Sequence, residues 1–140
     1  MSDDVERDAL VWLAFAMGDL EAARAHPGTH LRPRHVAMNA QQAAEKALKG
    51  ALVLSSIDPP RTHDLNALLQ LLPGSWLVVR RRPDLTTLSM HAVNSRYPDD
   101  IVPVQPIQAA TAVRQAMSVV RLVREDFERR GVSTRDLAPR

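Results

Sequence analysis

Apolar residues recur along this chain at the three- and four-residue spacing of α-helices, and alternating runs of β-branched residues are nearly absent. Alanine and leucine, which favour helices, supply most of these positions. The pattern predicts five helices, over about residues 4–25, 33–56, 64–72, 84–97 and 106–130. We therefore expect an all-α fold, an up-down bundle of about five helices forming one domain over residues 1–130, followed by a flexible tail over residues 131–140.

Proline, glycine and capping residues mark the ends of these helices. His26-Pro27-Gly28 ends the first helix, because proline cannot continue the hydrogen-bond ladder and glycine tolerates a left-handed turn. Pro33 lies in the first turn of the second helix, a favourable position for proline. Thr62 or Asp64 is placed to cap the third helix.

One apolar run lies outside the helical pattern. Residues 75–82 contain Trp76-Leu77-Val78-Val79, which is also compatible with a β-strand. A single strand would have no partner in this chain. We therefore expect a packed connection here and leave its role open.

The second predicted helix carries a stripe of small residues beside a polar stripe. Small residues let two helices approach closely, and they occur here as Ala37, Ala40, Ala44, Ala47, Ala51 and Leu54. The polar stripe consists of Asn39, Gln42, Lys46 and Lys49. Glu45 lies four residues before Lys49, the favourable order for an ion pair on a helix.

The charge distribution says more than the net charge of +2. Acidic residues predominate in residues 1–25, and arginines predominate in residues 101–140. The two regions can pair in a homodimer, the basic one can bind phosphate, or both can be ordinary solvated helix faces. The chain has no cysteine, an acidic Met1–Asp4 start and no apolar run longer than Ala9–Met17. We therefore expect a soluble, cytoplasmic protein without a membrane segment.

Several kinds of site are absent from the sequence. His26, His30 and His35 are interrupted by prolines and joined by no acidic cluster, so no metal site is expected. There is no cysteine nucleophile and no Gly-x-Ser-x-Gly motif. The five glycines form no phosphate-binding loop. We expect neither a metal nor another cofactor.

Three short stretches carry candidate functional residues: 39–50 on the second helix, 61–65 before the third, and 95–100 at the end of the fourth. Together they resemble the HEPN family, the nucleotide-binding domain named for higher eukaryotes and prokaryotes. The matching pieces are Gln42-Ala43-Ala44-Glu45-Lys46-Ala47-Leu48-Lys49, Thr62-His63-Asp64-Leu65 and Arg96-Tyr97-Pro98-Asp99, in the family's order. The likeness spans residues 5–130.

The resemblance implies a bundle of four to five helices that often dimerises. Small prokaryotic members are commonly encoded beside a minimal nucleotidyltransferase, and such pairs act as toxin–antitoxin modules. Other members are metal-independent ribonucleases that use an arginine and a histidine separated by four to six residues near the end of the fourth helix. This chain departs from that pattern, because no histidine follows His91. Arg24 and His30 have the spacing but straddle a helix end elsewhere in the fold.

Three functions therefore remain open. In the first, Lys46, Lys49, His63, Arg96 and Tyr97 line a groove that binds a nucleotide or RNA, or docks a nucleotidyltransferase. In the second, the chain is a ribonuclease toxin in which His63 or His91 acts as general base and Arg96 stabilises phosphate charge. The third is a structural dimerisation domain. As an alternative to a binding role, Gln42, Lys46, Arg96 and Asp99 can form a buried polar network that fixes the helix register.

Overall fold

The computed structural model describes residues 2–24, 31–94 and 103–140, and the side chains of residues 93 and 94 are not described. The described residues form helices and connecting segments, with no β-strand among them. The helices are α1 (Asp3–Ala23), α2 (Pro33–Leu54), α3 (Leu65–Leu71), α4 (Leu77–Arg80), α5 (Thr86–Asn94) and α6 (Pro106–Arg129). The prediction of an all-α bundle is confirmed, with one more helix than the sequence pattern indicated.

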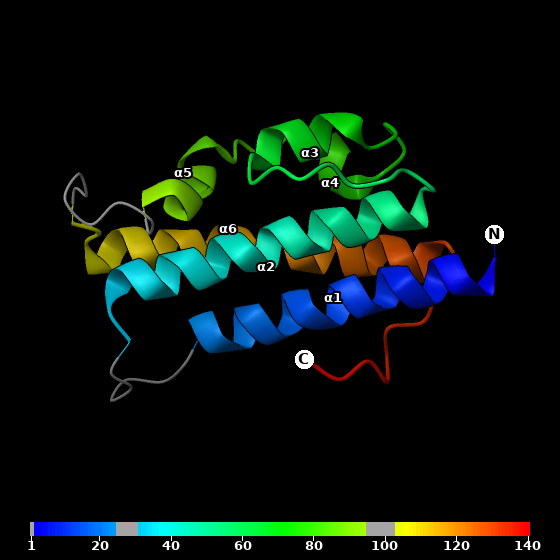
Figure 1. The fold of residues 1–140 in the computed structure, drawn as a ribbon, viewed down its shortest axis with the longest axis horizontal. Helices are drawn as coiled ribbons and strands as arrows, with labels where there is room; N and C mark the ends of the chain where they lie inside the picture. Colours follow the sequence, from blue (N-terminus) through cyan, green and yellow to red (C-terminus); the bar gives the residue numbers. More distant parts are fainter. Residues whose placement is uncertain (1, 25–30, 95–102) are drawn as a thin grey trace.

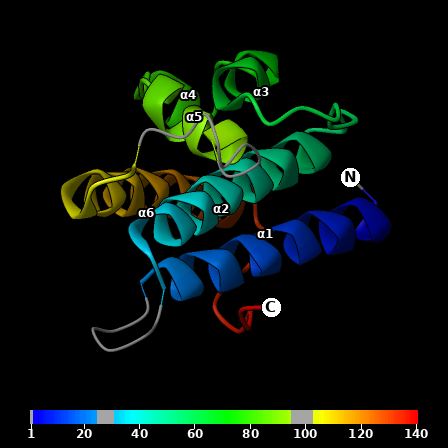
Figure 2. The same cartoon turned by 60° about the vertical axis from the view of Figure 1, so that its left-hand side comes forward.

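Three long helices, α1, α2 and α6, form the body of the domain, and the three short helices lie together on the side of α2 and α6 that faces away from α1 (Figures 1 and 2). The α2 helix is central, because it packs against α1, α6, α5 and α3. The α1 helix runs antiparallel to α2, whereas α6 runs in the same direction as α2 (Figure 1). The short helices α3, α4 and α5 connect the end of α2 to the start of α6, which lies at the opposite end of the bundle (Figure 1). None of the helices in the described part of the chain has both the length and the apolar character needed to cross a bilayer.

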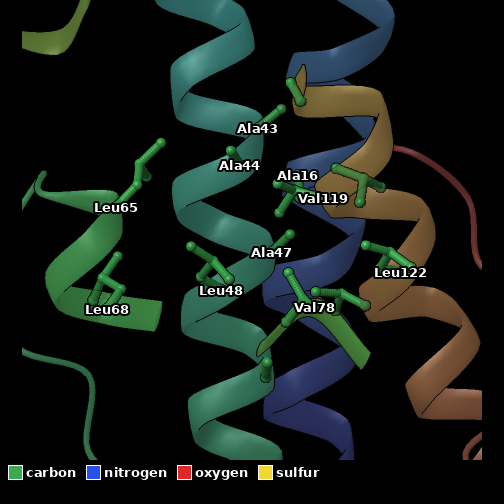
Figure 3. Packing of buried hydrophobic residues seen from close by; sticks show 14 of the residues in the cluster. Ala16, Ala43, Ala44, Ala47, Leu48, Leu65, Leu68, Val78, Val119 and Leu122 are labelled. Carbon is green, nitrogen blue, oxygen red and sulfur yellow. The ribbon is translucent and has the colours of Figure 1, made fainter. Parts of the chain in front are cut away.

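The core depends on small residues of α2 that allow its neighbours to approach. Ala43 and Ala47 point toward Ala16 of α1 and Val119 of α6, while Leu48 points toward α3 on the other side (Figure 3). All six residues of the predicted small-residue stripe are buried. Gly50 continues this close approach, because a Cβ atom there would lie 3.1 Å from Trp12 Cβ.

The α6 helix buries a face that differs in phase from the predicted one. The sequence predicted Ala110, Val113, Met117, Val120 and Phe127 as its core face. Val120 and Phe127 are buried as predicted, and Val113 and Met117 are half-buried, but Ala110 is exposed. The buried face also includes Ala109, Ala112, Ala116, Val119 and Val123. The difference is about one position along the helix, because α6 packs mainly on α2 and only lightly on α1.

The segment 75–82 contains the short helix α4 instead of an irregular connection. Its first turn is capped from a distance, because Asp126 Oδ2 accepts a hydrogen bond from the Leu77 backbone N–H at 2.6 Å. Trp76, just before the helix, is buried and contacts Phe127 edge-on, with ring centroids 6.2 Å apart. The role left open by the sequence is therefore to close the end of the core beside α6.

Residues 131–140 lie against the bundle. Val132 and Thr134 are buried, and Thr134 accepts two hydrogen bonds from Arg124 of α6. The Arg140 backbone N–H donates to the Ala14 carbonyl of α1 at 2.9 Å. The flexibility of this tail stays a prediction, and in the structure the segment packs against α1 and α6.

Candidate functional site

A single buried carboxylate organises the polar residues of α2. Glu45 accepts hydrogen bonds from Gln41 Nε2 at 3.0 Å and from Lys49 Nζ at 3.2 Å. It also lies 2.8 Å from His63 Nδ1. Because an ionised carboxylate only accepts hydrogen bonds, the His63 proton is on Nδ1. We call Gln41, Glu45, Lys49 and His63 the Glu45 cluster.

The helix periodicity and one turn bring these four residues together. Gln41, Glu45 and Lys49 are spaced four residues apart and therefore share a face of α2. His63 arrives from the segment before α3, whose N-terminus is capped by the Asp64 carboxylate. Gln41 Nε2 also donates to the His63 carbonyl at 3.3 Å, which fixes this segment against α2. The predicted Glu45–Lys49 ion pair and the Asp64 cap are both confirmed.

The cluster is buried at one end and open at the other. The Glu45 and Lys49 side chains are 6% and 11% exposed, whereas that of His63 is 43% exposed. Burial raises the pKa of Glu45, but hydrogen bonds from Gln41 and His63 and the charge of Lys49 outweigh burial and leave the pKa below its ordinary value of 4.5. Glu45 is therefore an anion at neutral pH that holds His63 in one orientation at the surface.

Lys46 does not join the other predicted binding residues. Its ammonium lies 2.6 Å from Asp19 of α1 and 5.7 Å from the centre of the Phe15 ring. The structure therefore brings Lys49 and His63 together on one carboxylate and turns Lys46 toward α1. The predicted network of Gln42, Lys46, Arg96 and Asp99 stays a prediction, because Arg96 and Asp99 lie outside the described residues. The described residues show a network one position earlier on the helix, around Gln41 and Glu45. Gln42 contributes only by donating to Gln41 Oε1 at 2.8 Å.

The remaining predicted residues are of two kinds. Arg96, Tyr97 and Asp99 lie outside the described residues, so their placement beside the Glu45 cluster stays a prediction. His91 lies on α5, and only 8% of its surface is exposed. Burial lowers the pKa of His91, and its Nδ1 has no hydrogen-bond partner among the described residues. Of the two candidate histidines, His63 is the one with both solvent access and a carboxylate partner.

A hollow of about 450 Å³ lies beside Lys49, between α1, the end of α2 and the loop after it. Its lining includes the Trp12 ring, with Lys49 Nζ 5.9 Å from the ring centre. Arg61 adds a second cation, and Asp8 and Asp58 add carboxylates. The hollow therefore offers a flat aromatic surface, cationic donors and anionic acceptors within one small space.

Sequence reasoning missed Gln41 and Trp12 altogether, and it treated Glu45 only as a partner for Lys49. The available signal was the position of Gln41 and Glu45, each seven residues before one of the buried leucines Leu48 and Leu52, which places these polar residues on a buried face. Because buried polar residues are almost always hydrogen-bonded, Gln41 and Glu45 could have been expected to contact a polar residue from another segment of the chain. Within the described residues, no group of three histidine, aspartate or glutamate side chains is arranged to hold a metal ion.

Comparison with known proteins agrees with this architecture. The model of the HEPN domain family matches residues 9–126. The chain is also similar to the crystal structure of TT1696 from Thermus thermophilus, with a TM-score of 0.69 and 28% sequence identity, covering 84% of this chain and 96% of that one. No curated protein matches the chain. The fold is an all-helical bundle, and the family model covers most of the sequence. The chain therefore belongs to the HEPN domain family.

Proposed function

We propose that this HEPN domain binds a nucleotide, free or within an RNA, as one component of a toxin–antitoxin-type pair whose other component is a minimal nucleotidyltransferase. The observation that carries the proposal is the hollow beside Lys49, which joins the Trp12 ring to Arg61 and to the Glu45 cluster. Its volume of about 450 Å³ lies in the range of small-molecule sites.

Each part of a nucleotide has a counterpart in this space. A base can stack on Trp12, as bases stack on aromatic residues in single-strand binding sites. Arg61 supplies charge-assisted hydrogen bonds to phosphate oxygens, and Lys49 borders the same space. Asp8 and Asp58 accept hydrogen bonds from ribose hydroxyls or from base amino groups. Arg96 and Tyr97, which lie outside the described residues, are further binding residues in this proposal, Arg96 for phosphate and Tyr97 for stacking on a base.

Lys46 and Lys49 act differently in this proposal from simple phosphate ligands. Both are already paired with carboxylates, so each brings little net positive charge. Lys49 positions the edge of the hollow, and Arg61 carries the larger share of phosphate recognition. His63 lies next to this edge and is held by Glu45.

Isothermal titration calorimetry with ATP, AMP and a short single-stranded RNA tests the proposal. Stacking on an aromatic residue is worth about 1–3 kcal/mol, so Trp12→Leu is expected to weaken binding by about fivefold to 150-fold. Arg61→Ala is expected to weaken ATP binding by about tenfold. Arg129→Ala, at an exposed arginine of α6 outside the hollow, is the matched control and should leave the affinity unchanged. Absence of binding to all three ligands, or wild-type affinity in both site variants, would contradict the proposal.

The proposed partner is tested separately by co-purification with a minimal nucleotidyltransferase encoded beside this chain. If a stable complex forms but this chain binds no nucleotide, its function is to dock the nucleotidyltransferase. If no complex forms and no nucleotide raises the melting temperature, a structural dimerisation domain becomes the better account.

A metal-independent ribonuclease is the second candidate, and one observation favours it. His63 Nδ1 lies 2.8 Å from the Glu45 carboxylate, an arrangement that orients an imidazole for general base catalysis through Nε2. In this account Arg96 stabilises the phosphate charge and His91 has no part, because His91 is buried. RNA cleavage in EDTA that is lost in both His63→Ala and Arg96→Ala, but kept in His91→Ala, would support the enzyme. No cleavage by the wild-type protein would refute it.

A further inference from the structure

A second hollow, of about 550 Å³, lies between α1 and α6. Its described lining residues are all different from those of the hollow beside Lys49, so an inference from it does not depend on nucleotide binding. We call it the arginine groove. Its apolar floor is formed by Leu20, Met117 and Val120. Its cationic rim is formed by Arg24, Arg114 and Arg121.

The rim arginines stand outside the ion pairs of the described part of the chain. None of the four side-chain ion pairs found there includes Arg24, Arg114 or Arg121. All three side chains are exposed, and Arg114 donates to the Thr111 hydroxyl of its own helix, at 3.1 Å. Three guanidinium groups therefore surround one groove with most of their hydrogen-bonding capacity available to an anion.

The spacing of the rim fits a helix laid along the groove. Arg114 and Arg121 lie seven residues apart on α6, which corresponds to about 10.5 Å along the helix axis. Two acidic residues seven positions apart on a docked helix have the same separation. Between them, leucine-like side chains of that helix would meet Met117, whose flexible thioether adapts to different apolar partners.

We propose that the arginine groove docks an acidic amphipathic helix of a partner protein. Its apolar face covers Leu20, Met117 and Val120, and its carboxylates pair with Arg114 and Arg121. This division between a buried apolar centre and a charged rim is that of helix-in-groove recognition.

The composition of the groove favours this occupant over nucleic acid. No aromatic residue is among its described lining residues, so these offer no stacking surface for bases. A phosphate chain would also leave the apolar floor uncovered, whereas the apolar face of an amphipathic helix covers it.

A second copy of this chain fits less well than a separate partner. Among the described residues, exposed acidic residues are most concentrated at the start of α1, where Asp3, Asp4 and Asp8 are exposed. The apolar neighbours in that segment face its own core, since Ala9 is fully buried and Val5 is half-buried. This end of α1 therefore offers carboxylates without an apolar face for the floor of the groove.

Fluorescence anisotropy with the full chain and a labelled synthetic peptide tests the inference. The probe is a helical peptide with leucines along one face and glutamates beside them, and the control peptide has lysines in place of the glutamates. We expect saturable binding of the acidic peptide alone, weakened by added salt. The double variant Arg114→Glu/Arg121→Glu should weaken it by at least tenfold, and Met117→Gln should weaken it at unchanged charge. Arg80→Glu, at an exposed arginine of α4 outside the groove, should change the affinity by less than twofold.

Circular dichroism of each variant establishes that the fold is kept. Three results would overturn the inference. The first is acidic-peptide binding that the double variant does not weaken. The second is a single-stranded RNA that binds in place of the peptide and is lost in the double variant. The third is a dimer, seen by sedimentation, that the double variant dissociates.

Discussion

The Glu45 cluster makes a quantitative prediction about stability. Glu45→Leu removes the acceptor shared by Lys49, Gln41 and His63 while keeping a side chain of similar size. Gln41 keeps the His63 carbonyl as an acceptor, and the exposed His63 ring can turn to water. The main loss is therefore that of the Lys49 ammonium, which is left without its counter-ion in a site where the side chain is only 11% exposed.

Breaking a buried ion pair from one side typically costs about 3–5 kcal/mol. Lys49 lies at the edge of a hollow and can reach water, so we expect a value near the lower end, about 3 kcal/mol. The double variant Glu45→Leu/Lys49→Met removes both charges and should recover stability to within about 1 kcal/mol of the wild type. Lys46→Met, which breaks the more exposed pair with Asp19, is the matched control and should cost about 1 kcal/mol or less.

Urea unfolding followed by circular dichroism and by tryptophan fluorescence measures these differences. The reasoning is refuted if Glu45→Leu costs less than about 1 kcal/mol, or if the double variant is as unstable as the sum of the two single changes. Either result would mean that the buried carboxylate and ammonium do not depend on each other.

Three further predictions concern the rest of the fold. Because folding lowers the pKa of Glu45, its ionised form stabilises the protein above about pH 4.5, and this contribution is lost as the pH falls through the lowered pKa. Urea titrations at several pH values should therefore show that the stability difference between the wild type and Glu45→Gln shrinks below about pH 4.5. A difference that grows as the pH falls would contradict this reasoning. Asp126→Ala removes the acceptor of the Leu77 N–H and should lower the free energy of unfolding by about 1–2 kcal/mol by urea denaturation; no loss would mean that this cap is not needed. Gly50→Val introduces atoms where even a Cβ lies 3.1 Å from Trp12 Cβ, so thermal unfolding should show a loss of about 1–3 kcal/mol, and an unchanged melting temperature would contradict the close packing of α1 on α2.

Local signals in the sequence were sufficient for most of the helices. Pro33 begins α2, Asp64 caps α3 and the alanine stripe of α2 is buried, each as the pattern indicated. These features depend on residues within one turn of one another or on the period of a single helix. The ion pair between Glu45 and Lys49 belongs to the same class.

Features that depend on distant partners could not be predicted in this way. The helix α4 is capped by Asp126, 49 residues later in the chain. The last residues lie on α1 because Gly18 leaves room for the Arg140 carbonyl and Ala14 accepts its N–H. For the candidate site, the sequence found Lys49 and His63 but not their common acceptor, because the meeting of Gln41 and Glu45 with His63 depends on how the 58–63 loop returns to α2.

The central claim is that the hollow beside the Glu45 cluster holds a nucleotide. Nuclear magnetic resonance of the ¹⁵N-labelled chain, titrated with ATP, tests it at the level of single residues. The account predicts that the largest shifts occur at the Trp12 indole N–H and at the backbone of Arg61 and His63, and that the arginine groove is unaffected. Shifts confined to α6, or no shifts at millimolar ATP, would contradict it.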